Sequence, residues 1–230
     1  MTLRPLVAAL LILLVACNQD TPVSAATPVE IERSSYRVER VVEGLEHPWS
    51  IAFLPDGELL ISERPGRLRR VVGGRLITEP VTGLPAIAAG GQGGLLDIAL
   101  HPEFARNRWV YLSYAAACSN GDRTTAVGRG QYRDGKIQDF APVFVALACS
   151  DTGQHFAGRM LFDNAGYLYL TIGDRGYRDR AQDGRNHAGT VLRLHDDGRI
   201  PEDNPFVNDD DVHDAIWSYG HRNPQGIALH

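Results

Sequence analysis

The feature that most constrains the fold is a repeated unit of short apolar strands separated by tight turns. Its first copy begins at His47 and reads HPWSIAFLPDGELLISERPGRLRRV. An apolar strand, a Pro-Asp-Gly turn, an alternating strand, a glycine turn and a second alternating strand follow one another. Alternating apolar and polar residues between such turns are typical of antiparallel hairpins. The unit therefore predicts a β-meander.

Comparable apolar segments recur three more times along the chain. The equivalent residues of the four segments are Phe53, Leu100, Phe162 and Leu229. Their spacings of 47, 62 and 67 residues form a loose period with several strands per unit, as in the blades of a β-propeller. No stretch sustains an amphipathic helical period, and the 24 glycines and 13 prolines favour many turns. We therefore expect an all-β fold built of propeller blades.

The fourth unit has only begun where the sequence stops. A propeller needs several blades to close its ring and to protect its edge strands. We therefore expect residues 36–230 to form the N-terminal part of a propeller domain, in a protein roughly twice as long.

The first 35 residues differ in composition from the rest. Residues 6–16 are apolar, too few to span about 30 Å of hydrocarbon but suited to the centre of an export signal. The end of this stretch with the next residue, Leu-Val-Ala-Cys at 14–17, resembles a bacterial lipobox, so we expect residues 1–17 to hold a signal peptide, with Cys17 as the lipid-modified first mature residue. An ordinary signal peptide cleaved near Ala25 is the alternative. Residues 18–35 are polar and rich in Ala, Thr and Pro, and we interpret them as a flexible tether.

Both interpretations place the protein outside the cytoplasm. We expect it in the periplasm, bound to the outer membrane only through a lipid anchor. There, Cys118 and Cys149 form an even pair in an oxidising compartment. They either bridge or remain two buried free thiols. A bridge would close a loop of about 30 residues and stabilise the fold by about 3–4 kcal/mol in the chain-entropy model.

Charge and motifs exclude several functions. The net charge of −5 comes with no basic block, so nucleic acid is not an expected partner. The Walker-type, GxGxxG, HExxH, CxxC and GxSxG patterns do not occur in the chain. The acidic residues 209–211 lack the spacing and glycine of an EF-hand loop and are interpreted as a surface loop. The histidines show no paired ligand spacing, so we expect no metal site within this chain.

His155 stands just before an alternating apolar run that ends at Gly173 and Asp174. If the turn at residues 164–166 folds this run into a hairpin, His155 and Asp174 lie at the same end of it. A carboxylate beside an imidazole holds a general base in one tautomer and raises its basicity. A surface histidine and a turn-capping aspartate with no common role are the alternative.

Two further loops carry polar groups. Residues 90–94 read GGQGG, with Gln92 at the centre, and form either a permissive turn or a close approach of the backbone to a ligand. Residues 220–226 read GHRNPQG, where Arg222 offers a planar donor fork suited to a carboxylate or a developing oxyanion. A solvated turn is the alternative for the second loop.

Five long motifs, in this order, resemble the soluble pyrroloquinoline-quinone-dependent aldose sugar dehydrogenases of the glucose/sorbosone dehydrogenase family. They read GLEHPWSIAFLPDGELLISER, GGQGGLLDIALHPEF, HFAGRMLFDNAGYLYLTIGDRG, GTVLRLHDDGRIPEDNPF and GHRNPQGIALH and cover about residues 40–230. The resemblance implies a six-bladed β-propeller with four-stranded blades. This chain would carry about three of the blades and the start of the next.

The resemblance also implies roles for individual residues. His155 would be the catalytic base, oriented by Asp174, and Gln92 would lie at the cofactor and the substrate. Arg222 and Asn223 would lie beside the quinone. The implied reaction oxidises an aldose at C1 to the lactone. The base takes the proton of the anomeric hydroxyl while hydride passes from C1 to the C5 carbonyl carbon of the quinone, and the arginine stabilises the charge on the quinone oxygen.

The sequence differs from the family pattern at one position, and some of the family's cofactor ligands would lie outside this sequence. Gln154 stands where the glucose-active branch has an acidic residue, which argues against strict glucose preference and makes this side chain a candidate for choosing the sugar. The family's calcium ligands and further basic cofactor ligands lie in its C-terminal half. We therefore expect pyrroloquinoline quinone and Ca²⁺ as cofactors, an external quinone, cytochrome or dye as electron acceptor, and no activity from this chain alone. A non-catalytic propeller that binds a ligand or partner is the alternative function.

Overall fold

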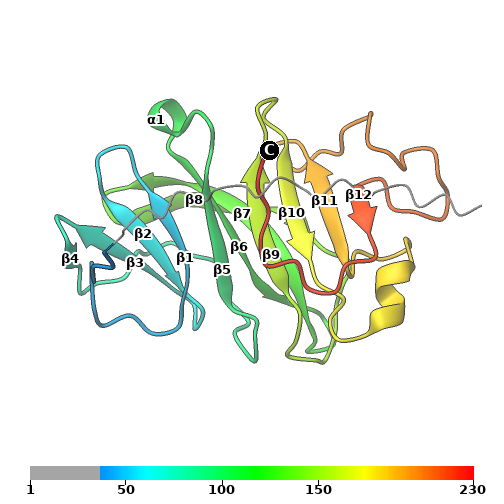
Figure 1. The fold of residues 1–230 in the computed structure, drawn as a ribbon, viewed down its shortest axis with the longest axis horizontal. Helices are drawn as coiled ribbons and strands as arrows, with labels where there is room; N and C mark the ends of the chain where they lie inside the picture. The colour runs from blue at the N-terminus through cyan, green and yellow to red at the C-terminus, as the bar shows by residue number, and fades with distance from the viewer. Residues whose placement is uncertain (1–36) are drawn as a thin grey trace, which may run out of the picture. The chain divides into compact units, whose positions relative to one another are not determined.

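A computed structural model describes residues 37–230 (Figure 1). The expected signal peptide, the lipidation site Cys17 and the tether of residues 18–35 lie outside the described residues. Within the described part, no helix is long and apolar enough to cross a membrane.

Within residues 37–230, twelve strands build three antiparallel sheets of four strands each, and in every sheet the strands follow chain order. The first sheet contains β1 (Pro48–Phe53), β2 (Leu59–Glu63), β3 (Arg67–Val72) and β4 (Arg75–Leu76). The second contains β5 (Leu95–Leu100), β6 (Trp109–Ala117), β7 (Arg123–Arg133) and β8 (Lys136–Val145). The third contains β9 (Ala157–Phe162), β10 (Leu168–Ile172), β11 (Thr190–Leu194) and β12 (Ile216–Tyr219). The described helices are α1 (Phe104–Asn107) and the 3₁₀ turn η1 (Arg178–Gln182). The predicted all-β fold with four-stranded meanders is confirmed.

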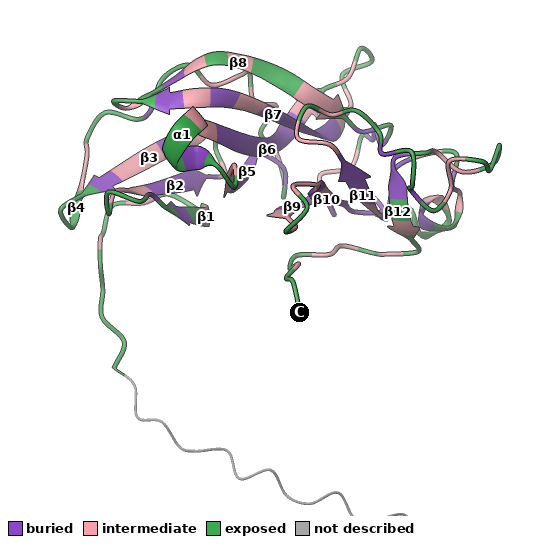
Figure 2. Cartoon of the chain, turned by 90° about the horizontal axis from the view of Figure 1, so that it is seen from above, coloured by how far each residue is buried: buried purple, intermediate pink, exposed green. Residues whose placement is uncertain are grey.

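The repeat found in the sequence marks the first strand of each sheet. Phe53, Leu100 and Phe162 are the last residues of β1, β5 and β9. These strands contact one another in turn, β1 with β5 and β5 with β9, while β4, β8 and β12 form the far edges of the sheets (Figure 2). The spacing of the apolar segments therefore located the inner strand of each blade correctly.

Both ends of the expected domain differ from this pattern. Residues 37–45 and 225–229 carry no strand. The second of these segments nevertheless lies against β9, where Arg159 Nε donates to the Gln225 carbonyl oxygen at 3.0 Å. A strand is stabilised by backbone hydrogen bonds to a neighbour. Among the described residues, nothing supplies that neighbour for either segment.

Within residues 37–230, two large apolar cores fill the spaces between adjacent sheets, and a smaller cluster contains Leu96, Ala115 and Phe156. One contains Leu60 of β2 and Leu112 of β6, and the other contains Tyr111 of β6 and Leu170 of β10. Successive side chains of a strand point to opposite faces, so β6 contributes to both cores. Packing on both faces of the second sheet fixes the order in which the three blades lie.

Asp97 connects the inner strands of all three sheets. Its buried carboxylate, 5% exposed, accepts hydrogen bonds from the Ser50 hydroxyl of β1 and from the Met160 backbone N–H of β9 at 2.8 Å. Arg159 donates to the same carboxylate at 3.2 Å, and its guanidinium lies 4.1 Å from the centre of the Trp49 ring. A buried carboxylate is tolerated when it is paired and hydrogen-bonded in this way.

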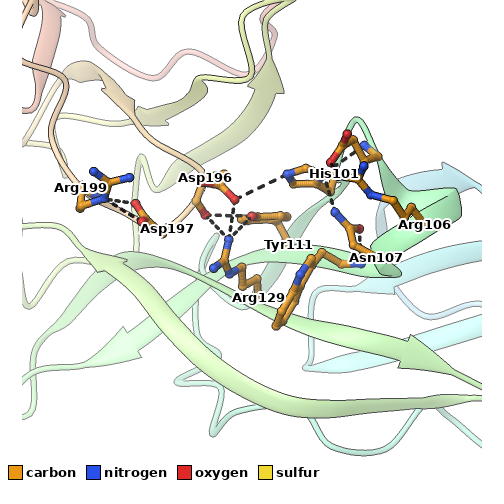
Figure 3. Close-up of polar contacts among 10 residues, drawn as sticks. His101, Arg106, Asn107, Tyr111, Arg129, Asp196, Asp197 and Arg199 are labelled. Atoms are coloured by element: carbon orange, nitrogen blue, oxygen red, sulfur yellow. Dashed lines mark hydrogen bonds and ion pairs between the residues drawn. The ribbon is translucent and has the colours of Figure 1, made fainter.

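A second polar network joins the second and third sheets near the ends of β5 and β11 (Figure 3). Arg129 donates to Asp196 Oδ2 at 2.8 Å and to the Tyr111 hydroxyl at 2.9 Å. The Tyr111 hydroxyl donates to the Asp196 carbonyl oxygen at 2.8 Å, and His101 Nε2 lies 3.6 Å from Asp196 Oδ2. Burial raises the pKa of Tyr111 to about 12, so its hydroxyl remains a donor at neutral pH. These contacts hold the two blades together at this end.

A disulfide joins Cys118 and Cys149, which are 31 residues apart in the sequence. The first cysteine follows β6 and the second follows β8, so the bond spans the hairpin of β7 and β8. Beside it, Arg123 and Ser150 exchange two backbone hydrogen bonds of 3.0 Å each. Of the two alternatives left open by the sequence, the structure contains the bridge.

Removal of this bridge in a Cys118→Ser/Cys149→Ser variant is expected to lower the free energy of unfolding by about 3–4 kcal/mol, because the open loop gains entropy in the unfolded chain. Urea unfolding with and without a reducing agent measures the effect. The reduced wild type should match the variant, and the variant should not respond to the reducing agent. Equal stabilities of the oxidised wild type and the variant would contradict the expectation.

His187 is buried between the second and third sheets. Its Nδ1 accepts a hydrogen bond from the Leu147 backbone N–H at 2.9 Å, and its ring lies 5.2 Å from that of Phe144 and 4.8 Å from that of His213. Burial, and secondarily His213, lowers the pKa of His187 from 6.5 to about 4. Between pH 6.5 and about 4, this imidazole is therefore neutral in the folded protein and protonated in the unfolded chain.

This shift predicts a pH dependence of stability. The contribution of His187 is complete above pH 6.5 and is lost as the pH falls towards 4, by about 3 kcal/mol in total. Urea unfolding at a series of pH values measures it. A His187→Asn variant, which keeps a hydrogen-bond acceptor but does not titrate, should lose most of the slope in this range. The same slope in the variant and the wild type would assign the pH dependence to other groups.

Candidate active site

The polar residues singled out from the sequence gather at the end of the blades where the inner strands begin. The second strand of each sheet runs antiparallel to the first and therefore ends there. Residues 90–94 and 153–156 precede β5 and β9, while Arg64 and Asp174 follow β2 and β10. Loops that are distant in the sequence thus meet at one place.

The hairpin of β9 and β10 brings His155 and Asp174 together as predicted. His155 Nδ1 lies 2.6 Å from Asp174 Oδ1, and the two side chains are 8% and 2% exposed. The same carboxylate oxygen accepts a hydrogen bond from the Gly176 backbone N–H at 2.7 Å. A carboxylate at Nδ1 places the proton of the neutral imidazole on that nitrogen. Nε2 is then the ring nitrogen with a free lone pair, as a general base requires.

The backbone around His155 is held in an uncommon conformation. His155 and Ala157 have φ angles of 50° and 52°, in the left-handed region that side chains other than glycine rarely adopt. The His155 N–H donates to Gln92 Oε1 at 2.8 Å, and the Ala157 N–H donates to Asn223 Oδ1 at 3.2 Å. At Gly173, a Cβ atom would lie 1.9 Å from the His155 carbonyl oxygen, so the end of β10 approaches this closely only without a side chain.

The glycine-rich run at residues 90–94 allows a close approach to neighbouring backbone segments. A Cβ atom at Gly91 would lie 2.4 Å from the Gly153 carbonyl oxygen, and one at Gly94 would lie 1.8 Å from the Arg64 carbonyl oxygen. The Gln92 N–H donates to the Gly153 carbonyl oxygen at 2.7 Å. The glycines therefore pack this loop against its neighbours and bring the Gln92 side chain to His155.

A cavity of about 260 Å³ opens beside the His155 backbone. Its lining residues are Trp49, Arg64, Gln92, Phe156, Ala157, Asn223 and Gln225. The contacts of Gln92 and Asn223 to the backbone use their side-chain oxygens, which leaves their NH₂ groups to other acceptors. Together with a guanidinium and an indole ring, these donors suit a flat ligand that carries carbonyl or carboxylate oxygens.

Three residues expected at the site are exposed: Gln92, which lines the cavity, Gln154 and Arg222. The Arg222 carbonyl oxygen accepts a hydrogen bond from the Asp174 N–H at 2.8 Å, but its guanidinium lies outside the wall of the cavity. The Gln154 side chain is exposed next to the buried pair. The structure thus gathers His155, Asp174, Gln92 and Asn223 and leaves the Arg222 side chain apart from them.

Sequence reasoning missed the contribution of the first blade. Trp49 and Arg64 line the cavity because Trp49 is the second residue of β1 and Arg64 directly follows β2. Arg64 occupies the place in its blade that Gly173 occupies in the third blade, one residue after the second strand. Comparing the units position by position would have found it. Among the described residues, no group of three or more His, Cys, Asp or Glu side chains forms a metal site.

The family model described as glucose/sorbosone dehydrogenase matches residues 45–230. The chain belongs to the glucose/sorbosone dehydrogenase family. It is 44% identical over 199 residues to the aldose sugar dehydrogenase YliI of Escherichia coli, an alignment that covers 85% of this chain and 54% of the relative. The chain therefore spans about half the length of this relative.

Solved structures agree with this membership. A crystal structure of a glucose dehydrogenase has a TM-score of 0.81 and 42% identity, with 84% of this chain and 57% of that chain covered. The PQQ-bound aldose sugar dehydrogenase of Streptomyces coelicolor has a TM-score of 0.71 and 30% identity, with 81% and 54% covered. The three sheets of this member of the family are blades of a β-propeller.

Proposed function

We propose that the complete protein to which this chain belongs oxidises aldose sugars at C1 with pyrroloquinoline quinone as cofactor. The observation that carries the proposal is the buried pair of His155 and Asp174, 2.6 Å apart, next to a polar cavity lined by Gln92 and Phe156, in a chain of this family. The alternative, a non-catalytic binding propeller, leaves this pair without a role.

The cavity beside His155 fits the chemistry of the proposed cofactor. Gln92 and Asn223 offer NH₂ donors to carbonyl and carboxylate oxygens, Arg64 offers a guanidinium and Trp49 an aromatic face. The exposed Arg222 is the further cation that would approach the quinone from the neighbouring segment. When bound, the quinone supplies the two-electron acceptor for the hydride of the sugar. Calcium is proposed to seat it, with ligands from outside residues 37–230.

The chain's own residues handle the proton. Oxidation at C1 converts the anomeric C–H and O–H of the sugar into the lactone carbonyl, so one hydride and one proton leave. His155 Nε2 takes the proton of the anomeric hydroxyl, because Nδ1 is occupied by Asp174. The carboxylate of Asp174 stabilises the imidazolium that forms and keeps the ring oriented. Gln92 and Asn223 fix the backbone on both sides of this ring.

We further propose that the enzyme works in the periplasm and passes its electrons to an external quinone, cytochrome or dye. The disulfide between Cys118 and Cys149 supports an oxidising compartment, because such bonds persist outside the cytosol.

The complete protein, loaded with pyrroloquinoline quinone and calcium, tests the proposal in an assay with a dye acceptor and a panel of aldoses. We expect sugar-dependent dye reduction, with the lactone as product and several aldoses accepted. Residues 37–230 alone should be inactive in the same assay. No sugar-dependent reduction by the loaded complete protein would overturn the proposed function.

A further inference from the structure

Arg175 directly follows Asp174 and is fully buried, at 0% exposure. Its NH1 donates to the Gln154 carbonyl oxygen at 3.0 Å and its NH2 to the Arg123 carbonyl oxygen at 3.4 Å. The guanidinium lies 3.4 Å from the centre of the Phe156 ring, and Nε has no hydrogen-bond partner. Among the described residues, no carboxylate forms a salt bridge with it. Burying a cation in this way is costly, and it lowers the pKa of Arg175 to about 10.

The contacts of Arg175 bracket His155. Gln154 precedes the histidine and Phe156 follows it, so one guanidinium fixes the carbonyl on one side and the ring on the other. His155 between them has a φ angle of 50°, and Arg175 itself has a φ angle of 60°. Backbone of this kind persists only where the surroundings hold it. Gln92 holds the His155 N–H, Asn223 the Ala157 N–H and the Thr125 hydroxyl the Phe156 carbonyl oxygen. The Arg175 guanidinium adds the contact to the Gln154 carbonyl oxygen from the Asp174 side.

Arg175 and Asp174 are neighbours in the chain, so their contacts to His155 and to the residues beside it are coupled. The carboxylate of Asp174 fixes the His155 ring at Nδ1, while the guanidinium of Arg175 fixes the backbone that carries the ring. The Arg175 side chain is fully buried, at 0% exposure, and its guanidinium is covered by the Phe156 ring. We therefore assign it no direct contact to sugar or cofactor.

We propose that Arg175 is a positioning residue, which holds His155 against Asp174 in the orientation that proton transfer requires. Its kinetic consequence rests on the proposed function. Displacement of a catalytic group by about 1 Å can cost about 10²-fold in rate. Loss of the Arg175 contacts should therefore lower turnover more than it lowers the binding of sugar or cofactor.

Arg193 of β11 offers a matched control. It is also a buried arginine, with its side chain 8% exposed, its Nε without a partner and its guanidinium 3.9 Å from the centre of the Tyr167 ring. It lies near the end of β11, whereas His155 and Asp174 lie where β11 begins. Unlike Arg175, it forms a salt bridge with Asp203 at 3.1 Å. Replacing it disturbs another buried, ring-stacked guanidinium without touching the His155 segment.

Arg175→Lys and Arg193→Lys are compared in the complete protein loaded with pyrroloquinoline quinone and calcium. Lysine keeps a positive charge but loses the planar fork that reaches two carbonyl oxygens. We expect R175K to lower kcat by about 10-fold or more, with KM for the sugar and affinity for the quinone within about two-fold of wild type. R193K should keep the wild-type kcat. Arg175→Met, without any donor, is the second variant and should lose at least as much turnover.

A spectroscopic measurement tests the positioning role of Arg175 independently of the proposed sugar oxidation. In protein labelled with ¹⁵N-histidine, the proton between His155 Nδ1 and Asp174 gives a signal that is assigned by its absence in a His155→Gln variant. This signal should shift or weaken in R175K and stay unchanged in R193K. Wild-type kcat with an unchanged signal in R175K overturns the positioning role, as does an equal loss in R193K. If the wild type oxidises no sugar, the proposed function fails, and the signal alone still decides the role of Arg175.

Discussion

A His155→Ala variant of the complete protein is expected to lose about 10²- to 10⁴-fold in kcat, the range that a positioned general base contributes. The physical reason is that Nε2 accepts the anomeric proton in the proposed reaction, and among the described residues no other imidazole beside this cavity is paired with a buried carboxylate. Affinity for pyrroloquinoline quinone should stay near the wild-type value, because the amides and guanidinium of the cavity wall remain. Steady-state dye reduction and titration with the quinone measure the two quantities.

His195 provides the control for this substitution. It follows β11 at the opposite end of the third sheet, and its N–H donates to the Arg199 carbonyl oxygen at 2.8 Å. His195→Ala should leave kcat unchanged. Wild-type turnover in the His155→Ala variant would remove the assigned role of this histidine as base.

The second large effect is expected for Asp174→Asn, which keeps the shape of the side chain and removes its charge. Oδ1 of asparagine can still accept from the Gly176 N–H and from His155 Nδ1, so the loop keeps its contacts. The imidazolium that forms during the reaction loses its stabilising carboxylate, and kcat should fall by about 10²- to 10⁴-fold. KM for the sugar should change much less, since Asp174 is buried behind the histidine. Steady-state kinetics across the aldose panel measure both.

Asp163 is the matched control at the other end of the same hairpin. Its Oδ1 accepts from the Ala165 and Tyr167 backbone N–H groups at 2.9 Å each, so it caps the turn between β9 and β10. Asp163→Asn should leave kcat unchanged. Equal turnover losses at both aspartates would indicate that the hairpin, and not the charge on Asp174, matters.

The blades were predictable because their signals are local. An alternating strand and its turn lie within one short segment, so the apolar repeat located the inner strands and the turn after Phe162 placed His155 beside Asp174. The cysteine pair was predictable as a possibility but not as a bond, since spacing alone leaves the geometry open.

The other features of the site depend on contacts between blades. A single segment of the sequence does not contain both partners of such a contact. Arg64 reaches the cavity only because the first blade lies next to the second. The burial of Arg175 results from Phe156 and two carbonyl oxygens contributed by distant segments. The side chain of Arg222 is exposed, although its backbone holds the Asp174 N–H, and the sequence pattern does not distinguish these two roles.

The central claim is that His155 and Asp174 act as one unit, and a double variant tests it most directly. In the complete loaded protein, kcat is measured for the wild type, His155→Ala, Asp174→Asn and the combination of both. Residues that act as a unit are strongly non-additive, so the combined variant should lie within about two-fold of His155→Ala alone. If Asp174→Asn lowers kcat by the same factor in the His155→Ala background as in the wild type, the two losses multiply and the account is contradicted.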